Sequence, residues 1–110
     1  SWGTTLALAY AASYPDKVLS LVLRSVFLMQ SREIEWFMHG IRSLRPEAWE
    51  TFVEAIPTDE RKGDRLLDVY LEQLLNEDPT VHMPAARRWF LYEIGCSTLV
   101  ENKNTTMSAE

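Results

Sequence analysis

The first three residues, Ser1-Trp2-Gly3, constrain this chain more than any other stretch. They are followed by Thr4–Ala12, a run of small and apolar residues that predicts a helix. Together these residues form the second half of a nucleophile elbow, whose full pattern is Gly-x-Ser-x-Gly. Glycine is needed at Gly3 because a Cβ there would collide with the strand that leads into the turn. A simpler alternative is that Ser1 only caps the N-terminus of a helix.

The next segment predicts a strand. Pro15 ends the first helix, and Asp16-Lys17 turns the chain into Val18–Leu23, a short aliphatic run rich in β-branched residues. Such a run is typical of a buried parallel strand. A serine turn, a helix and a buried strand in this order make half of a doubly wound α/β unit.

From Arg24 onward the pattern predicts helices alone. Ser31 is a candidate N-cap, Pro46 suits a first helical position, and Gly63 is a candidate joint. Four apolar stripes follow the helical period: Ile34, Phe37, Met38 and Ile41; Trp49, Phe52, Val53 and Ile56; Leu67, Tyr70, Leu71 and Leu74; and Ala86, Trp89 and Phe90 together with Glu93. Gly95 weakens the last helix, and residues 101–110 have no periodicity and are predicted to be loop.

Composition excludes several classes of protein. A net charge of −5 with scattered basic residues argues against a nucleic-acid partner. No apolar run is long enough for a membrane span, and no signal peptide is visible. The single cysteine, Cys96, favours a reducing compartment, so we expect the protein to be cytoplasmic. The chain starts inside a motif and without methionine, so we expect it to be a piece of a longer protein.

Other polar residues give no second site. His39 and His82 lack the spacing of a zinc site, and each is expected to be a packing or solvated residue. Glu33 and Glu35 are interpreted as a solvated face, not as an acid/base pair. We therefore expect no metal and no cofactor.

The order of residues resembles the proline iminopeptidases, serine peptidases of the α/β-hydrolase fold. The resemblance covers nearly the whole chain, and its most specific part is the run from Ser1 to Ala11. More diffuse matches follow in the same order: Tyr14-Pro15, Val18, Leu21–Arg24, Phe27, Glu33–Phe37, Pro46–Trp49, Asp59–Arg61, Glu77–Pro79, Ala85–Arg87, Trp89 and Tyr92-Glu93.

The resemblance implies a serine aminopeptidase that releases N-terminal proline from peptides. It assigns the nucleophile to Ser1 and one oxyanion-hole donor to the backbone N–H of Trp2. Glu93 matches the cap carboxylate that receives the substrate's free amino group, through a charge-assisted hydrogen bond worth about 1.5–3 kcal/mol. Phe27 matches an aromatic wall of the proline pocket, and Phe37 is a second candidate for that wall.

The sequence departs from the family pattern at Pro84, which suggests that the last helix begins there and not at Pro79. Arg24-Ser25-Val26-Phe27 stands in place of the more usual Arg-Gly-Ile-Phe. In this fold the acid and the histidine of the triad follow the cap, and neither is found here. We therefore expect the isolated chain to be inactive.

These observations predict an α/β-hydrolase fragment that is mostly α-helical, with one short buried β-strand after the nucleophile helix. Residues 1–27 are expected to belong to the hydrolase core and residues 28–110 to a helical cap. The sequence leaves the oligomeric state open. It also leaves two alternatives: another α/β-hydrolase, such as an esterase, or a non-catalytic helical interaction module.

Overall fold

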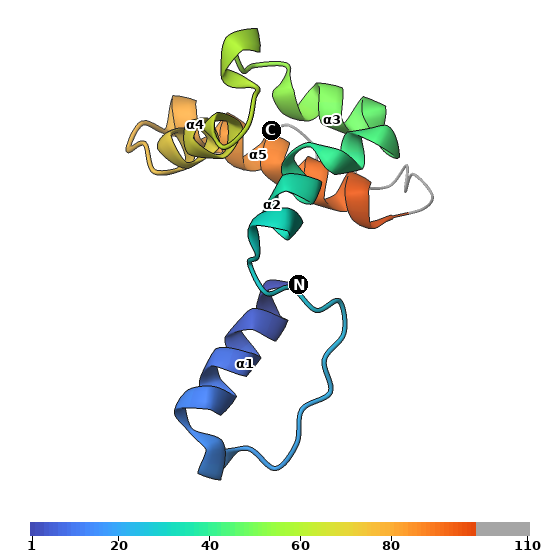
Figure 1. Cartoon of the computed structure of the whole chain (residues 1–110). Helices are drawn as coiled ribbons and strands as arrows, with labels where there is room; N and C mark the ends of the chain where they lie inside the picture. The colour runs from blue at the N-terminus through green and yellow to red at the C-terminus, as the bar shows by residue number, and fades with distance from the viewer. Residues whose placement is uncertain (99–110) are drawn as a thin grey trace. The chain divides into compact units, whose positions relative to one another are not determined.

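The computed structural model describes residues 1–98, and the predicted loop at 101–110 lies outside them. The described residues form two compact units, one over Ser1–Phe37 and a second that begins at Met38. This division falls later than the predicted boundary between residues 27 and 28, and the assignment of core and cap remains a prediction. Figure 1 shows the helices in chain order: α1 (Trp2–Ser13), α2 (Ser31–Met38), α3 (Pro46–Val53), α4 (Arg65–Leu74) and α5 (Pro79–Ser97), with short 3₁₀ turns at Pro15–Lys17, Gly40–Ser43 and Thr58–Glu60.

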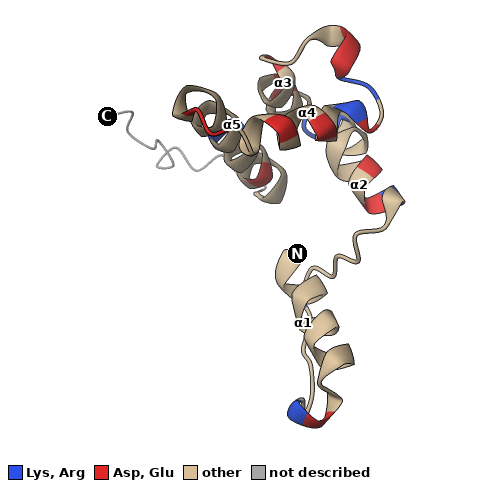
Figure 2. Ribbon diagram, turned by 90° about the vertical axis from the view of Figure 1, so that its left-hand side faces the viewer, with Lys and Arg blue, Asp and Glu red and all other residues tan. Residues whose placement is uncertain are grey.

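The first helix, α1, ends where the sequence predicts. The N–H of Tyr14 bonds the carbonyl of Tyr10 at 2.8 Å, and Pro15 then begins a 3₁₀ turn. No charged side chain lies on α1, and Figure 2 shows charge only at the turn that follows it. Trp2, Leu6 and Tyr10 are each at least half exposed on this helix. A helix without a charged face is typical of one that packs inside a larger fold.

The predicted buried strand at Val18–Leu23 is not confirmed. The segment begins with extended backbone at Val18, but no strand is found anywhere in residues 1–98. Leu19 and Val22 are fully exposed, so the expected burial is wrong for the described residues. A strand exists through hydrogen bonds to a neighbouring strand, and these residues supply no neighbour.

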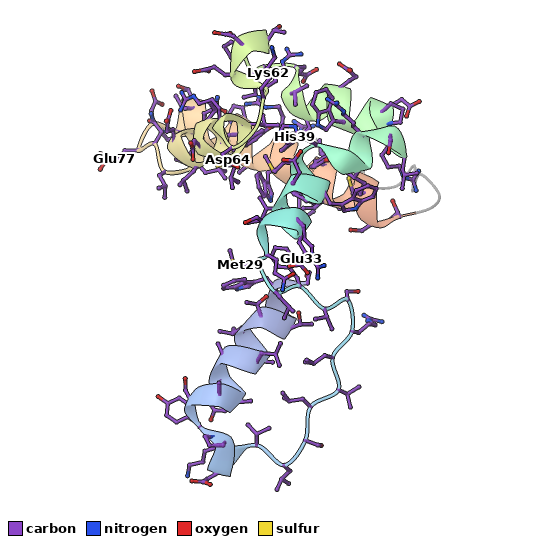
Figure 3. The ribbon with its side chains drawn as sticks, viewed as in Figure 1. Met29, Glu33, His39, Lys62, Asp64 and Glu77 are labelled. Atoms are coloured by element: carbon purple, nitrogen blue, oxygen red, sulfur yellow. The ribbon has the colours of Figure 1, made fainter. Side chains whose placement is uncertain are left out.

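The connection between Val18 and α2 contains two residues in the left-handed region of backbone space, Ser25 and Met29, each with φ of 56°. The carboxylate of Glu33, in the first turn of α2, accepts hydrogen bonds from the N–H groups of Leu28 at 3.1 Å and Gln30 at 2.9 Å. Figure 3 shows Glu33 beside Met29. The helix begins at Ser31, so the predicted cap is wrong by one residue, and Glu33 caps the helix from within its first turn.

Aromatic rings form the core of the second unit. The burial predicted for the second stripe is confirmed, because Trp49, Phe52 and Val53 of α3 and Ile56, just after it, are all buried. The ring of Phe52 stacks on Tyr70 of α4 at 4.3 Å and on Tyr92 of α5 at 4.0 Å between centroids. Trp89 meets Phe52 edge-on at 5.8 Å. This cluster joins three helices whose sequence stripes alone do not specify their partners.

The predicted faces of α4 and α5 are partly wrong. On α4 the structure buries Leu66, Val69 and Tyr70, whereas Leu71 is 53% exposed. On α5 the buried residues are Ala85 and Tyr92, while Ala86, Phe90 and Glu93 are exposed. Each helix presents a face rotated from the predicted one, because the contact with neighbouring helices selects the buried side.

The last helix begins at Pro79, so a start at Pro84 is wrong. Asp78 caps it by accepting the N–H of Thr80 at 2.8 Å. Pro84 lies inside the helix, where its missing N–H leaves the carbonyl of Thr80 without its helical partner. Thr80 is exposed, so water can satisfy that carbonyl. Gly95 lies inside this helix, which continues to Ser97. A Cβ at Gly95 would lie 3.2 Å from that of Ala48, so glycine allows α3 and α5 to approach closely.

Candidate active site

Ser1 lies immediately before α1 with an exposed side chain. It occupies the N-cap position, but its hydroxyl makes no capping hydrogen bond. The simpler alternative, that Ser1 is present as a cap, therefore lacks the bond that defines a cap. The hydroxyl is left available at the start of a helix.

The backbone N–H of Trp2 lies at the first position of α1. The first N–H groups of an α-helix have no acceptor inside the helix, and the helix dipole places partial positive charge there. The first turn is closed by the N–H of Thr4, which bonds the carbonyl of Ser1 at 2.9 Å. An N–H at the position of Trp2 is chemically suited to stabilise an oxyanion that forms on a group attacked by Ser1.

The close approach predicted at Gly3 is not confirmed. A Cβ at this position would meet nothing within 4 Å among the described residues. The expected collision requires a strand packed against the turn, and residues 1–98 contain no strand.

Phe27 is held against this turn by two threonine hydroxyls. The hydroxyl of Thr4 accepts the N–H of Phe27 at 3.0 Å and donates to the carbonyl of Ser1 at 2.7 Å. The hydroxyl of Thr5 donates to the carbonyl of Phe27. The structure thus brings the predicted pocket aromatic to the turn that carries Ser1 and Trp2.

Sequence reasoning missed Thr4 and Thr5, although both follow Gly3 directly. Thr4 is 7% exposed, which makes it the buried polar residue of the first unit. The available signal was a pair of hydroxyl side chains in an otherwise apolar helix, where a threonine needs a local or tertiary partner. The partner is a residue 22 or 23 positions away, which no sequence spacing indicates.

The other two predicted site residues are on α2 and α5. Phe37 is on α2, half-buried, at the end of the first unit. Glu93 is on α5 in the second unit, exposed, and it shares its face with Ala86 and Phe90. A hollow between α3 and α5 is lined by neither residue; its walls include Arg45, Phe52, Arg88, Tyr92 and Gly95.

Both histidines bond backbone carbonyls within the second unit. His39 Nε2 lies 2.9 Å from the carbonyl oxygen of Gly63, and His82 Nδ1 lies 2.9 Å from that of Asn76. Each ring therefore has a hydrogen-bond partner in the backbone, which the sequence did not predict. Over residues 1–98 no cluster of histidine, cysteine and carboxylate side chains is arranged to hold a metal ion. None of the helices described there combines the length and apolar character that a membrane span requires.

Comparison with known proteins decides the family. Residues 1–77 match the family model for the alpha/beta hydrolase fold. The chain belongs to this family. Ser1 lies directly before α1, and in α/β-hydrolases the nucleophile stands on a sharp turn that leads into a helix.

Several similar proteins are named proline iminopeptidase. A "Proline iminopeptidase" of Arabidopsis thaliana is 44% identical over the whole chain, and one of Xylella fastidiosa is 38% identical over the whole chain. A third, of Neisseria gonorrhoeae, is 39% identical over 84% of it. The chain spans 29%, 35% and 30% of the lengths of these three proteins, respectively. No solved structure matches it significantly.

Proposed function

We propose that the complete protein is a serine aminopeptidase that releases proline from the N-terminus of peptides. The observation that carries the proposal is the position of Ser1 directly before α1, with no side-chain capping hydrogen bond, in an α/β-hydrolase chain. Relatives named proline iminopeptidase over the full length of the chain supply the substrate class. Residues 1–27 then belong to the catalytic core, residues 28–110 to the helical cap, and the enzyme acts in the cytoplasm.

The reaction in this proposal begins at Ser1. Its Oγ attacks the carbonyl carbon of the N-terminal proline residue while a general base takes the hydroxyl proton. Negative charge develops on the carbonyl oxygen, and the N–H of Trp2 donates to that oxygen. The peptide amine leaves with a proton, and water then hydrolyses the prolyl ester to free proline and Ser1. The base and its acidic partner are supplied by parts of the protein other than these 110 residues.

Glu93 would recognise the free terminus. The ring nitrogen of an N-terminal proline carries a positive charge at neutral pH. A carboxylate accepts a strong, charge-assisted hydrogen bond from that nitrogen. Glu93 is exposed on the same face of α5 as Ala86 and Phe90. A carboxylate on a partly apolar face is suited to a substrate that combines an ammonium group with a hydrocarbon ring. Phe27 and Phe37 would supply flat walls for that ring.

Glu93→Gln in the protein expressed from its complete coding sequence tests the proposal. With a proline arylamide as substrate, we expect kcat/KM to fall by about 10- to 100-fold, because one charge-assisted hydrogen bond is lost. Ser1→Ala should abolish turnover. Glu50→Gln, at another exposed glutamate, is the matched control and should leave the rate unchanged. An enzyme that cleaves simple esters, shows no proline arylamidase activity and is indifferent to Glu93→Gln would be a different α/β-hydrolase.

A further inference from the structure

The hydroxyl of Thr4 connects two backbone groups that have separate roles in the proposed reaction. It donates to the carbonyl of Ser1 at 2.7 Å and accepts the N–H of Phe27 at 3.0 Å. Thr4 is 7% exposed, so neither bond competes freely with water. The Thr4 hydroxyl therefore links the carbonyl of the nucleophile residue to the backbone N–H of the pocket aromatic.

Phe27 is restrained at its other backbone group as well. Its carbonyl accepts the hydroxyl of Thr5, so both its N–H and its C=O are bonded to α1. On the C-terminal side, Glu33 accepts the N–H groups of Leu28 and Gln30. The backbone around Phe27 is thus held by side chains from α1 and α2, although no sheet supports it in the described residues.

We propose that Thr4 and Thr5 are positioning residues that fix the ring of Phe27 relative to the Ser1 hydroxyl and so determine the preference for a cyclic N-terminal residue. This inference rests on the proposed function. Neither threonine contacts substrate in this proposal; each acts through the backbone of Phe27. The preference arises because a flat wall at a fixed position contacts a proline ring along its length, whereas a methyl side chain leaves the wall uncovered.

The test uses Thr4→Val, which keeps the shape of threonine and removes the hydroxyl. The readout is the ratio of kcat/KM for proline arylamide to kcat/KM for alanine arylamide. Loss of folded protein lowers both rate constants equally and cannot change this ratio. We expect the ratio to fall about tenfold in Thr4→Val, mainly through a higher KM for proline arylamide, and to recover in Thr4→Ser.

Thr5→Val provides a second variant, because Thr5 is less buried than Thr4 and its replacement disturbs the packing of α1 less. The matched control is Thr51→Val, since Thr51 bonds the carbonyl of Glu47 within α3 and is exposed. An unchanged ratio in both Thr4→Val and Thr5→Val, in an enzyme that does release proline, overturns this inference and leaves the proposed function intact. If the unmodified enzyme releases no proline, both the proposed function and the positioning role of Thr4 and Thr5 are wrong.

Discussion

The hydroxyl of Tyr70 donates a hydrogen bond to the carbonyl of Phe52, and the rings of the same two residues stack with a 7° angle between their planes. Tyr70 is fully buried, and burial raises the pKa of its phenol. The carbonyl of Phe52 is one of the last four of α3, which have no partner inside the helix. One tyrosine therefore supplies both ring packing and a cap for the end of α3.

Replacing Tyr70 separates these two contributions. Tyr70→Phe keeps the ring and leaves the carbonyl of Phe52 buried without its donor, so we expect a loss of about 1–3 kcal/mol in the free energy of unfolding. Phe52→Ala removes the ring that contacts both tyrosines and should cost about 3–5 kcal/mol. Phe90→Ala, at an exposed ring of α5, should change stability by about 0.5 kcal/mol or less. Urea unfolding followed by circular dichroism measures the free energy of unfolding of all three variants. A Tyr70→Phe variant as stable as Phe90→Ala would contradict the role of the Tyr70 hydroxyl as a cap of α3.

The left-handed backbone at Ser25 predicts a stabilising substitution. With φ of 56°, Ser25 has a Cβ that strains the backbone, and glycine removes that strain while it adds freedom to the unfolded chain. The net gain expected for Ser25→Gly is about 0.5–1 kcal/mol, measured by thermal unfolding. Ser20→Gly is the control, because Ser20 lies in the same connection without positive φ. Ser20→Gly should be neutral or destabilising. Equal changes in stability for Ser20→Gly and Ser25→Gly would show that the positive φ of Ser25 does not strain the folded chain.

The start of α5 predicts a dependence on pH. The N–H and hydroxyl of Thr80 each donate to Asp78 at 2.8 Å, and the backbone bond, followed by the hydroxyl bond, lowers the pKa of this carboxyl. A lowered folded pKa means that its contribution is complete above the unfolded pKa, near 4, and is lost as the pH falls through the lower folded value. Asp78→Ala should reduce the melting temperature at pH 7 more than at pH 2.

Asp78→Asn separates the charge from the cap, since asparagine also accepts the N–H of Thr80. Its melting temperature at pH 7 should lie between those of the unmodified protein and Asp78→Ala. Comparison of Asp78→Asn with Asp78→Ala at both pH values therefore isolates the contribution of the charge. Equal losses for Asp78→Ala at pH 7 and pH 2 would show that ionisation of Asp78 does not contribute.

The isolated 110-residue chain should release no measurable product from a proline arylamide. Ser1 lies in a unit, Ser1–Phe37, that contains no histidine, and both histidines of the chain bond carbonyls in the second unit. A serine hydroxyl without a base is a poor nucleophile at neutral pH. The assay compares the chain with its Ser1→Ala variant, and release that depends on Ser1 would contradict this expectation.

Local sequence signals account for part of the structure. Pro15 and Pro46 mark a helix end and a helix start, and the spacing of Trp49, Phe52, Val53 and Ile56 identifies the buried face of α3 and of the turn that follows it. These features depend on residues within a few positions of one another. The same reasoning fails on α4 and α5, where several faces are apolar and the position of the neighbouring helices selects among them.

The sequence by itself determined the family, the place of Ser1 before a helix, and the presence of several helices within residues 31–97, although the predicted helical pattern from Arg24 does not hold over residues 24–30. Only the tertiary structure decided that Thr4 and Thr5 hold Phe27, that Glu33 caps α2 from within, and that Val18–Leu23 has no strand to pair with in residues 1–98. The physical reason is range. Periodicity and capping act within a turn or two of the chain, whereas a hydroxyl that bonds a backbone 23 residues away, or a strand that needs a neighbour, depends on where distant segments come to lie.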